Sequence, residues 1–366
     1  MPAKRQLAES PAQPSSPSTP QDGVDNDTRA LPCVQQLSEG LHYSAKNLLD
    51  LRLMHHYSVF TSEYFTRTFP EEAAYGLKVQ IPRLALGHDF LMDALLLVSM
   101  VHLGCTDPVS LSALPIYLYR DQALRSLRRA VADISPLTAN AVRSASVLLA
   151  TISFAADRIT QQSGLWIANW LTLVLGQRNF RISATSQQHS TTPSPGQSNG
   201  QFPSSVYGSF VDLPTPVALA TDIQRALSRE DTDIGWADRE ALHKAATELC
   251  RLIAVLEHPY EELWLEKKIK AWAFDVVPFE FFELARQARP QALVILAYYL
   301  ALFKFLPDTW TYQGVASHDI EQICNEIPRA WEEYISVPRM AVQMDDRTSL
   351  AQMLLSCCVR GREERV

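Results

Sequence analysis

Apolar residues recur at spacings of three and four along most of the chain between residues 45 and 358, and this is the period of an α-helix. Stretches in which apolar and polar residues alternate strictly between Asn-Gly or Asp-Gly turns, as in strands joined by hairpins, do not occur. The pattern therefore predicts an all-α fold, organised as a multi-helix domain.

The first helical stretch begins near Ala45 and ends before Pro70. Its predicted apolar face is made of Leu48, Leu49, Leu53, Tyr57, Phe60 and Tyr64. The next stretch, residues 88–103, is apolar almost all round, which is typical of a central core helix. We expect four of its residues to be buried: Leu91, Leu95, Val98 and Leu103. Residues 90–103 are interrupted by Asp93 and, at ~1.5 Å per residue, are too short to cross ~30 Å of hydrocarbon, so no membrane span is expected.

Further helices are predicted on both sides of residue 183. They cover residues 117–134, 138–156 and 165–180 before it, and 216–227, 236–257, 260–274, 291–305, 317–331 and 348–358 after it. Ser135 and Thr138 are candidate caps of the second helix. In 117–134 we expect the arginines to face mostly outward. Six apolar residues are expected to face inward: Leu118, Ala123, Leu124, Leu127, Val131 and Ile134. In 291–305 we expect an apolar stripe of Leu293, Leu296, Ala297, Leu300 and Ala301.

Two segments show no helical period. Residues 1–40 are rich in Pro, Ser and Gln and lack the apolar stretch of a signal peptide, and residues 183–212 are dominated by Ser, Gln, Thr, Pro and Gly. We expect a disordered tail over 1–40 and a flexible insertion over 183–212. The insertion would divide the helical region into an N-terminal half, 41–182, and a C-terminal half, 213–366.

The charge of the chain argues against direct binding to nucleic acid. The net charge is −7, and the sequence has no block of clustered Lys and Arg for phosphate contacts. Lys4-Arg5 could be half of a nuclear import signal, but two basic residues are more often a solvated tail. Arg120, Arg125, Arg128 and Arg129 are spread around their predicted helix. We therefore expect no sequence-specific DNA binding by this chain alone.

Motifs for catalysis or metal binding are missing from the sequence. HExxH, GxSxG, GxxxxGK[ST] and GxGxxG do not occur. The six cysteines (Cys33, Cys105, Cys250, Cys324, Cys357 and Cys358) form no CxxC pair, so buried reduced thiols are expected rather than a zinc site or a disulfide framework. We assign no catalytic residue, no metal ligand and no cofactor, and the residues of any cofactor-binding site stay unknown.

Individual polar residues have ordinary structural explanations. His55 and His56 are adjacent, so they diverge on a helix and are expected to split between packing and solvent. His102 is expected to be a hydrogen-bonded core residue, and His318 to have no partner. Asp89 lies in a first helical turn, where negative charge is favoured, so Asp89 and Asp93 are not expected to hold a metal. Glu261, Glu262, Lys267 and Lys268 are expected to form a charged helix face, and Asp345-Asp346 a solvated turn.

Aromatic residues gather in two regions, and two interpretations of them stay open. The residues are Trp166, Trp170, Phe279, Phe281, Phe282, Tyr298, Tyr299, Phe303, Phe305, Trp310 and Tyr312. Such clusters are usually core. They are also what the wall of an apolar ligand pocket between helices requires.

Several blocks occur in an order that resembles a known family. They are LMHHY at 53–57, FLMDALLLVSMVHL at 90–103, a helix with Tyr119, Ala123 and Leu124, PQALVILAYY at 290–299, and the later Trp310, Trp331 and Pro338. Together, over about residues 46–340, they resemble the regulatory (middle homology) domain of fungal zinc binuclear-cluster transcription factors, in the branch of the sterol uptake control proteins. The resemblance implies an α-helical regulatory domain, a nuclear location with shuttling to the cytoplasm, and in that branch a receptor for a hydrophobic small molecule.

The chain departs from that family in one respect. The family reads DNA with a six-cysteine zinc cluster, whereas residues 1–44 contain a single cysteine, Cys33. Three explanations stay open: a sequence that lacks its first part, a regulator that acts through a partner, and a repurposed domain. We expect a transcriptional regulator or coregulator of a fungal metabolic pathway, secondary-metabolite or sterol-related, and not an enzyme. Its partners would be a DNA-binding protein or a second copy, and an apolar small molecule. The alternative is a cofactor-free enzyme or binding protein for an apolar metabolite.

Overall fold

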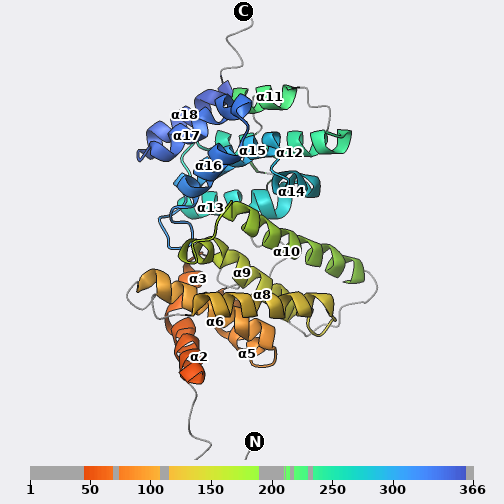
Figure 1. The fold of residues 1–366 in the computed structure, drawn as a ribbon, viewed down its shortest axis with the longest axis vertical. Coiled ribbons are helices and arrows are strands. Elements are labelled where there is room, and N and C mark those ends of the chain that lie inside the picture. The colour runs from red at the N-terminus through yellow and green to blue at the C-terminus, as the bar shows by residue number, and fades with distance from the viewer. Residues whose placement is uncertain are drawn as a thin grey trace, which may run out of the picture. The chain divides into compact units, whose positions relative to one another are not determined.

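The computed structural model describes residues 45–68, 74–107, 115–188, 210, 212–214, 218–229 and 234–359. These residues form helices, turns and loops, with no strand among them, which confirms the predicted all-α fold (Figure 1). The expected tail, 1–40, and most of the expected insertion, 183–212, lie outside the described residues. Met1–Leu48 and Leu49–Val366 are two separate units, and both hydrophobic cores lie in the larger one.

The first core is built around α6. The helices before and around it are α2 (Ala45–His56), the π-helical turn η1 (Tyr57–Thr61), α3 (Ser62–Thr68), the π-helical turn η2 (Gly76–Gln80), α5 (Ile81–Ala85), α6 (Asp89–Thr106), α8 (Ile116–Ala132) and α9 (Ala139–Ile159). The apolar helix α6 packs against α8 and α9. Leu91, Leu95, Val98 and Leu103 are buried there, as the sequence predicts, because this helix is covered on nearly all sides.

The π-helical turn η1 changes the buried face of the first helical stretch. Leu53, Tyr57, Thr61 and Phe65, each four residues after the last, are buried. A π turn has more residues per turn than an α-helix, so a spacing of four stays on one side instead of drifting round the axis. The predicted face was therefore wrong at Leu48 and Phe60, which are 56% and 54% exposed.

The buried face of α8 also differs from the prediction. Ile116, Tyr119, Ala123 and Leu127 are buried, whereas Leu118 is 70% exposed and Val131 and Ile134 face solvent. Polar contacts made by two neighbouring residues of α8 fix this orientation, because Tyr119 donates to Asp50 and Arg120 pairs with Asp157. The spacing of apolar residues alone does not reveal these two distant partners, Asp50 and Asp157.

Ser135 and Thr138 are bonded to each other in the turn that precedes α9. Ser135 Oγ accepts a hydrogen bond from the backbone N–H of Thr138 at 3.3 Å, and Thr138 Oγ1 accepts one from the backbone N–H of Ser135 at 3.0 Å. Thr138 is the N-cap residue of α9 but makes no side-chain hydrogen bond to that helix, so the expectation that it caps α9 is wrong.

The second core contains the remaining helices. They are α10 (Trp166–Gln188), α11 (Thr221–Ser228), α12 (Trp236–Val255), α13 (Glu262–Ala271), the π-helical turn η3 (Trp272–Val276), α14 (Phe279–Arg286), α15 (Pro290–Ala301), the 3₁₀ turn η4 (Leu302–Phe305), α16 (Val315–Glu326), the 3₁₀ segment η5 (Arg329–Ile335), α17 (Ser336–Gln343) and α18 (Arg347–Val359). In α15 every residue from Gln291 to Ala301 is buried, which includes the five residues of the expected apolar stripe, and α15 is a central helix of this core.

The two cores meet at α9. Ala150 and Phe154 of α9 belong to the second core, together with the buried residues of α10. α10 continues to Gln188, so the first six residues of the expected insertion are helical, contrary to the prediction for that part. The division of the domain at the insertion stays a prediction.

Among the residues that the structure describes, two helices, α6 and α9, are long and apolar enough to span a bilayer by length and composition. α6 has 18 residues, so the expectation that it is too short was wrong. Of the apolar windows in α6 and α9, 67% and 78% are buried against the rest of the fold, which accounts for their apolar character as core helices.

Candidate functional site

Four aromatic side chains, from α2, α3, α6 and a loop much later in the sequence, meet beside the first core. His56 comes from the end of α2, Tyr64 from α3, His102 from α6, and Trp310 from the loop of residues 306–314 that precedes α16. The Trp310 ring lies 5.0 Å from that of His102 and 5.1 Å from that of Tyr64, centroid to centroid, and the two imidazoles are 5.1 Å apart. We refer to these four residues as the aromatic junction.

His102 is held at the junction by polar contacts. Its Nδ1 lies 2.8 Å from Thr61 Oγ1 and 3.3 Å from His56 Nε2. Burial, with a smaller effect of His56, lowers the pKa of His102 to about 4, and burial with the charge of Arg52 lowers the pKa of His56. Both imidazoles are therefore neutral at pH 7. The expectation of a hydrogen-bonded core histidine is confirmed, and so is the split of the pair, since His55 is exposed and His56 half-buried.

The 306–314 loop is tied to the first core by side chains on both sides of Trp310. Tyr64 Oη lies 3.0 Å from Thr311 Oγ1. Arg158, near the end of α9, donates to the backbone carbonyls of Trp310 and Gln313 at 2.9 and 2.7 Å, and contacts Cys105 Sγ at 3.4 Å. A charged guanidinium that binds two carbonyls makes stronger hydrogen bonds than neutral donors do. The loop is thus fixed to α3 and α9.

The junction lacks the groups of an acid–base site. Within the described residues, neither imidazole has a carboxylate among its hydrogen-bond partners, so no carboxylate–histidine pair can orient and charge a base. The Trp310 indole Nε1 is buried and has no acceptor in the part of the chain that the structure describes. The arrangement packs the 306–314 loop against the first core.

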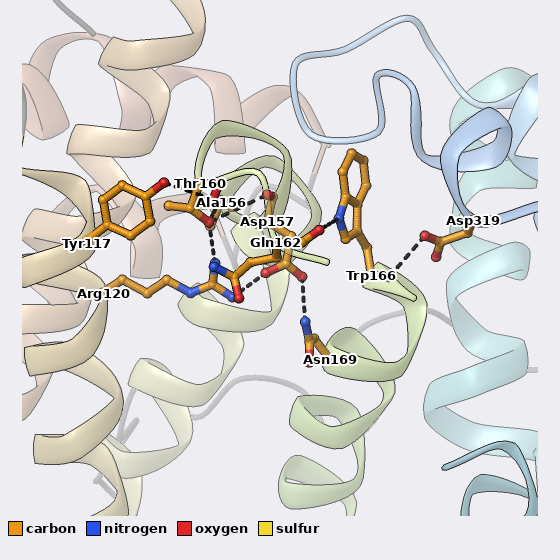
Figure 2. A network of polar contacts seen from close by, with 9 residues as sticks. All are labelled: Tyr117, Arg120, Ala156, Asp157, Thr160, Gln162, Trp166, Asn169 and Asp319. Atoms are coloured by element: carbon orange, nitrogen blue, oxygen red, sulfur yellow. Dashed lines mark hydrogen bonds and ion pairs between the residues drawn. The ribbon is translucent and has the colours of Figure 1, made fainter. Parts of the chain in front are cut away.

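A second polar network joins α8, α9 and α10 (Figure 2). The buried carboxylate of Asp157 pairs with Arg120 and accepts a hydrogen bond of 3.1 Å from Asn169 Nδ2. Arg120 also donates to Thr160 Oγ1 at 2.7 Å, and Tyr117 Oη donates to the Thr160 carbonyl at 2.9 Å. Burial raises the pKa of Asp157, and Arg120 and Asn169 oppose that shift. The expectation that Arg120 points outward is wrong, because its charge is needed at Asp157.

The network continues to α16 through the first turn of α10. Asp319 accepts hydrogen bonds from the backbone N–H groups of Trp166 at 3.0 Å and Ile167 at 2.6 Å. His318 Nδ1 lies 2.8 Å from Asp319 Oδ1, and the imidazole stacks on the Trp166 indole at 3.6 Å between centroids. The expectation that nothing pairs with His318 is therefore wrong. Burial raises the pKa of Asp319 to about 6, against the effect of these donors.

The other sequence candidates have structural explanations. Asp89 lies in the first turn of α6, and Asp93 accepts a hydrogen bond from Gln122 at 2.7 Å. Asp346 caps α18 by accepting from the backbone N–H of Ser349 at 2.8 Å. Cys105, Cys250, Cys324, Cys357 and Cys358 are free thiols. Three or more His, Cys, Asp or Glu side chains do not gather into a possible metal site within the described ranges.

The aromatic residues of the second half are packed as core. Phe281, Phe282, Tyr298, Tyr299 and Phe305 are buried, and Trp272 stacks on Tyr299 at 4.3 Å between ring centroids. Phe279, which the sequence placed in the same aromatic cluster, is 51% exposed. A cavity between α11, α12 and α15, lined by Leu227, Arg229, Ile234, Arg239, Leu242, His243 and Gln291, has a volume of ≈ 20 Å³, which is room for about one water molecule.

A buried ion pair on α13 was missed. Glu266 and Lys270 lie 2.6 Å apart and are nearly buried, and Tyr312 donates to Glu266 at 3.2 Å. Lys268, expected on a charged face, is buried, with its ammonium group 5.3 Å from the Trp264 ring centroid. The i, i+4 spacing of Glu266 and Lys270 was a signal for the pair, but not for its burial.

Comparison with known proteins finds relatives over part of the chain. No family model matches the sequence. The Zn(2)-C6 fungal-type transcription factor afumD of Aspergillus fumigatus is 28% identical over 148 residues, which are 40% of this chain and 40% of that protein. Sterol uptake control protein 2 of Candida albicans is 33% identical over 152 residues, 40% of this chain and 20% of that protein. Its namesake in Saccharomyces cerevisiae is 36% identical over 112 residues, 30% of this chain and 12% of that protein.

The matched stretches cover 40% or less of each of these relatives. The chain is thus similar, over part of its length, to fungal transcription factors that include sterol uptake control proteins, and this similarity supports the fungal transcription factor family.

Proposed function

We propose that this chain is a transcriptional regulator or coregulator of a fungal metabolic pathway, secondary-metabolite or sterol-related, that works in the nucleus. The names of the partial relatives support this role. One structural observation supports it most: blocks that carry the family resemblance, distant in the sequence, meet in the aromatic junction. His56 comes from the LMHHY block, His102 from the second block, and Trp310 follows the PQALVILAYY block.

The junction gives the domain a route for coupling its two cores. Tyr64 and Arg158 hold the 306–314 loop from the first core, and the same loop leads directly into α16, whose Asp319 caps α10. Coupling between distant parts of a protein requires such a physical connection through packed side chains and hydrogen bonds. In this proposal, a partner or an apolar small molecule bound to one core changes how the other core is presented.

DNA recognition is proposed to come from a DNA-binding partner protein, and a second copy of the chain is the other proposed partner. The printed sequence has a net charge of −7 and no CxxC pair. Of the four arginines that could have formed a basic stripe on α8, Arg120 pairs with Asp157 and Arg125 pairs with Asp121. Phosphate contacts, which position a protein on DNA, need basic side chains that are free of such partners.

A tethering assay tests the regulatory role. The full chain is fused to an unrelated DNA-binding domain, and a reporter with the matching operator is measured in a fungal host. We expect reporter expression to change several-fold, and an unchanged reporter with well-expressed fusion would contradict the proposal. Trp310→Leu, in the junction, is expected to lose most of the effect, whereas Trp236→Leu, at a residue 79% exposed, retains it.

A second experiment tests the partner. The purified chain is titrated against labelled promoter fragments of co-located genes at physiological salt. We expect only weak binding that unlabelled competitor DNA removes. Specific modules reach ~10⁻⁸ M or tighter with the help of phosphate contacts, and the sequence has no block of clustered Lys and Arg to make them. Nanomolar, competitor-resistant binding by the chain alone would contradict the partner part of the proposal and leave the regulatory role standing.

A further inference from the structure

A small cavity lies where α11, α12 and α15 pack against one another. Three of its lining residues are apolar: Leu227, Ile234 and Leu242. The other four carry hydrogen-bond donors: Arg229 directly after α11, Arg239 and His243 in the first half of α12, and Gln291 in the first turn of α15. Donors from three parts of the second core therefore line one space.

The lining of this cavity is positively charged. The guanidinium groups of Arg229 and Arg239 are charged at pH 7, and the lining residues that the structure describes include no carboxylate. The chain as a whole is acidic, with 40 Asp and Glu against 33 Lys and Arg, so this lining is opposite in sign to the chain. Because two like charges beside one cavity repel each other, an anion bound between them would lower the electrostatic energy.

Contacts with η5 hold one of the two arginines in place. Arg229 Nη1 donates to the backbone carbonyl of Ala330 at 2.7 Å, and the guanidinium carbon lies 4.9 Å from the centroid of the Trp331 ring. That carbonyl takes one of the five N–H donors of a guanidinium, so the group has further donors for a ligand. A side chain whose position is already fixed loses less conformational entropy when a ligand binds.

The other two basic side chains come from one face of α12. Arg239 and His243 are four residues apart, and side chains at this spacing are neighbours on a helix surface. Both line the cavity, and both are exposed to solvent, as is Arg229. A ligand can therefore reach the charged side of the cavity from solution.

The size of the cavity and its charge favour a phosphoryl group. The volume of ≈ 20 Å³ holds about one water molecule, and one terminal oxygen of a phosphoryl group occupies a similar space. A phosphoryl group has three terminal oxygens and a charge of about −1.5 to −2 at pH 7. A carboxylate has only two oxygens and a single charge. Two arginines and a histidine therefore match the phosphoryl group better than the carboxylate.

We propose that this cavity binds the phosphoryl group of a small phosphate ester. One oxygen enters the cavity, and Arg229, Arg239 and His243 bind the other oxygens at its exposed side. The ligand thereby connects the end of α11 to α12 and stabilises the second core. This charged ligand differs from the apolar small molecule of the proposed function, and its site does not rest on the proposed role in transcription.

Isothermal titration calorimetry of the full chain tests the site. Inorganic phosphate, glycerol 3-phosphate and acetate are titrated at pH 7 and constant ionic strength. We expect saturable binding of both phosphates with dissociation constants on the order of 1 mM or below, and a melting temperature that rises with phosphate concentration. Acetate should bind about tenfold more weakly, because it brings one charge and two oxygens.

Matched variants test whether the phosphates bind in the cavity. Arg239→Gln should weaken the binding of both by about tenfold or more, since a hydrogen bond to a charged group contributes about that much. Arg239→Lys keeps the charge and should bind phosphate more tightly than Arg239→Gln. The control is Lys244→Gln, because Lys244 is exposed on the same helix and does not line the cavity, and this variant should bind as the wild type does.

Circular dichroism checks that each variant is folded, and Arg229→Gln, with the same expected loss, replaces Arg239→Gln if that variant is not. The absence of saturable phosphate binding by the wild-type chain would overturn the proposal. Equal affinities for acetate and phosphate, or equal phosphate affinities of Arg239→Gln and Lys244→Gln, would overturn it as well. Binding of inorganic phosphate without binding of glycerol 3-phosphate would contradict a phosphate ester as the ligand.

Discussion

The carboxylate of Asp319 in α16 accepts a hydrogen bond of 3.0 Å from the backbone N–H of Trp166, 153 residues earlier in the sequence. The neighbouring N–H of Ile167 donates to the other carboxylate oxygen at 2.6 Å. A helix start leaves such N–H groups without partners, and here a side chain from a distant helix satisfies them. Asp319 of α16 therefore holds the start of α10 in place. Its negative charge also interacts favourably with the dipole of α10 at that end.

Asp319→Ala should destabilise the domain clearly. The change leaves two N–H groups at the start of α10 without an acceptor, so we expect the free energy of unfolding to fall by about 2–3 kcal/mol. Urea denaturation monitored by far-UV circular dichroism measures it. The matched control is Asp345→Ala, because that side chain is fully exposed and its contact with Lys304 is long, and it should change stability by less than about 0.5 kcal/mol. An equal change in the free energy of unfolding in the two variants would contradict the role of Asp319 in holding α10.

His102 should make stability depend on pH. Its pKa is about 4 in the folded protein, against 6.5 when exposed, so the unfolded state binds more protons between these values. The stability that His102 contributes is therefore complete above pH 6.5 and is lost as the pH falls toward 4, in total about 3 kcal/mol. The raised pKa of Asp319 acts in the opposite direction over a similar range.

The measurement compares the wild-type protein with His102→Gln. The difference in their free energies of unfolding is followed from pH 7 to pH 4, and the effect of Asp319, present in both proteins, cancels. We expect the wild type to lose stability relative to the variant as the pH falls. A difference that stays flat across this window would show that His102 is not held neutral.

Arg120→Ala should be far more damaging than Arg125→Ala. Arg120 pairs with Asp157, whose side chain is fully buried, and removal leaves that carboxylate without its charged partner. We expect a loss of about 2–3 kcal/mol, less than a fixed buried charge would give because Asp157 can take up a proton. Arg125 pairs with Asp121 on the surface, where both side chains are more than half exposed, so its loss should be below about 0.5 kcal/mol. Thermal or urea unfolding of both variants checks the ranking, and a reversed ranking would contradict the buried network.

Leu95→Asp and Leu118→Asp compare a buried apolar residue of the first core with an exposed one. Leu95 lies at the centre of α6 and is fully buried, so an aspartate there should unfold the domain, because an unpaired charge in a core costs several kcal/mol. Leu118 is apolar in sequence but 70% exposed, and an aspartate there should be tolerated. Circular dichroism and gel filtration of both variants give the answer. A cooperatively melting Leu95→Asp protein would show that α6 is not central.

The sequence predicts those features that depend on one segment alone. The burial of α6 follows from its continuous apolar residues, and the buried stripe of α15 follows from the spacing of its apolar residues. Features set by distant partners were missed. The face of α8 depends on Asp50 and Asp157, and the partner of His318 is an aromatic ring on α10. The π turn η1 moves Phe60 out of the core, and no local residue pattern signals such a turn.

The candidate site was predictable only in its parts. His102 was expected to be a hydrogen-bonded core residue, and Trp310 to follow the PQALVILAYY block, but their contact joins α6 to a loop about 200 residues later. The spacing of apolar residues predicts which face of a helix is buried, but it does not identify the segment that packs against that face. The long-range contacts of Tyr64 and Arg158 therefore required the structure.

Transcript profiling after deletion of the gene tests the central claim most directly. The deletion strain is compared with the parent and with a strain that carries the gene back at another locus. We expect transcripts of neighbouring or sterol-related genes to change several-fold in the deletion strain and to return in the complemented one, because the chain is proposed to regulate their expression. Unchanged transcripts together with a blocked metabolite step would contradict the account and favour a protein that acts on a metabolite itself.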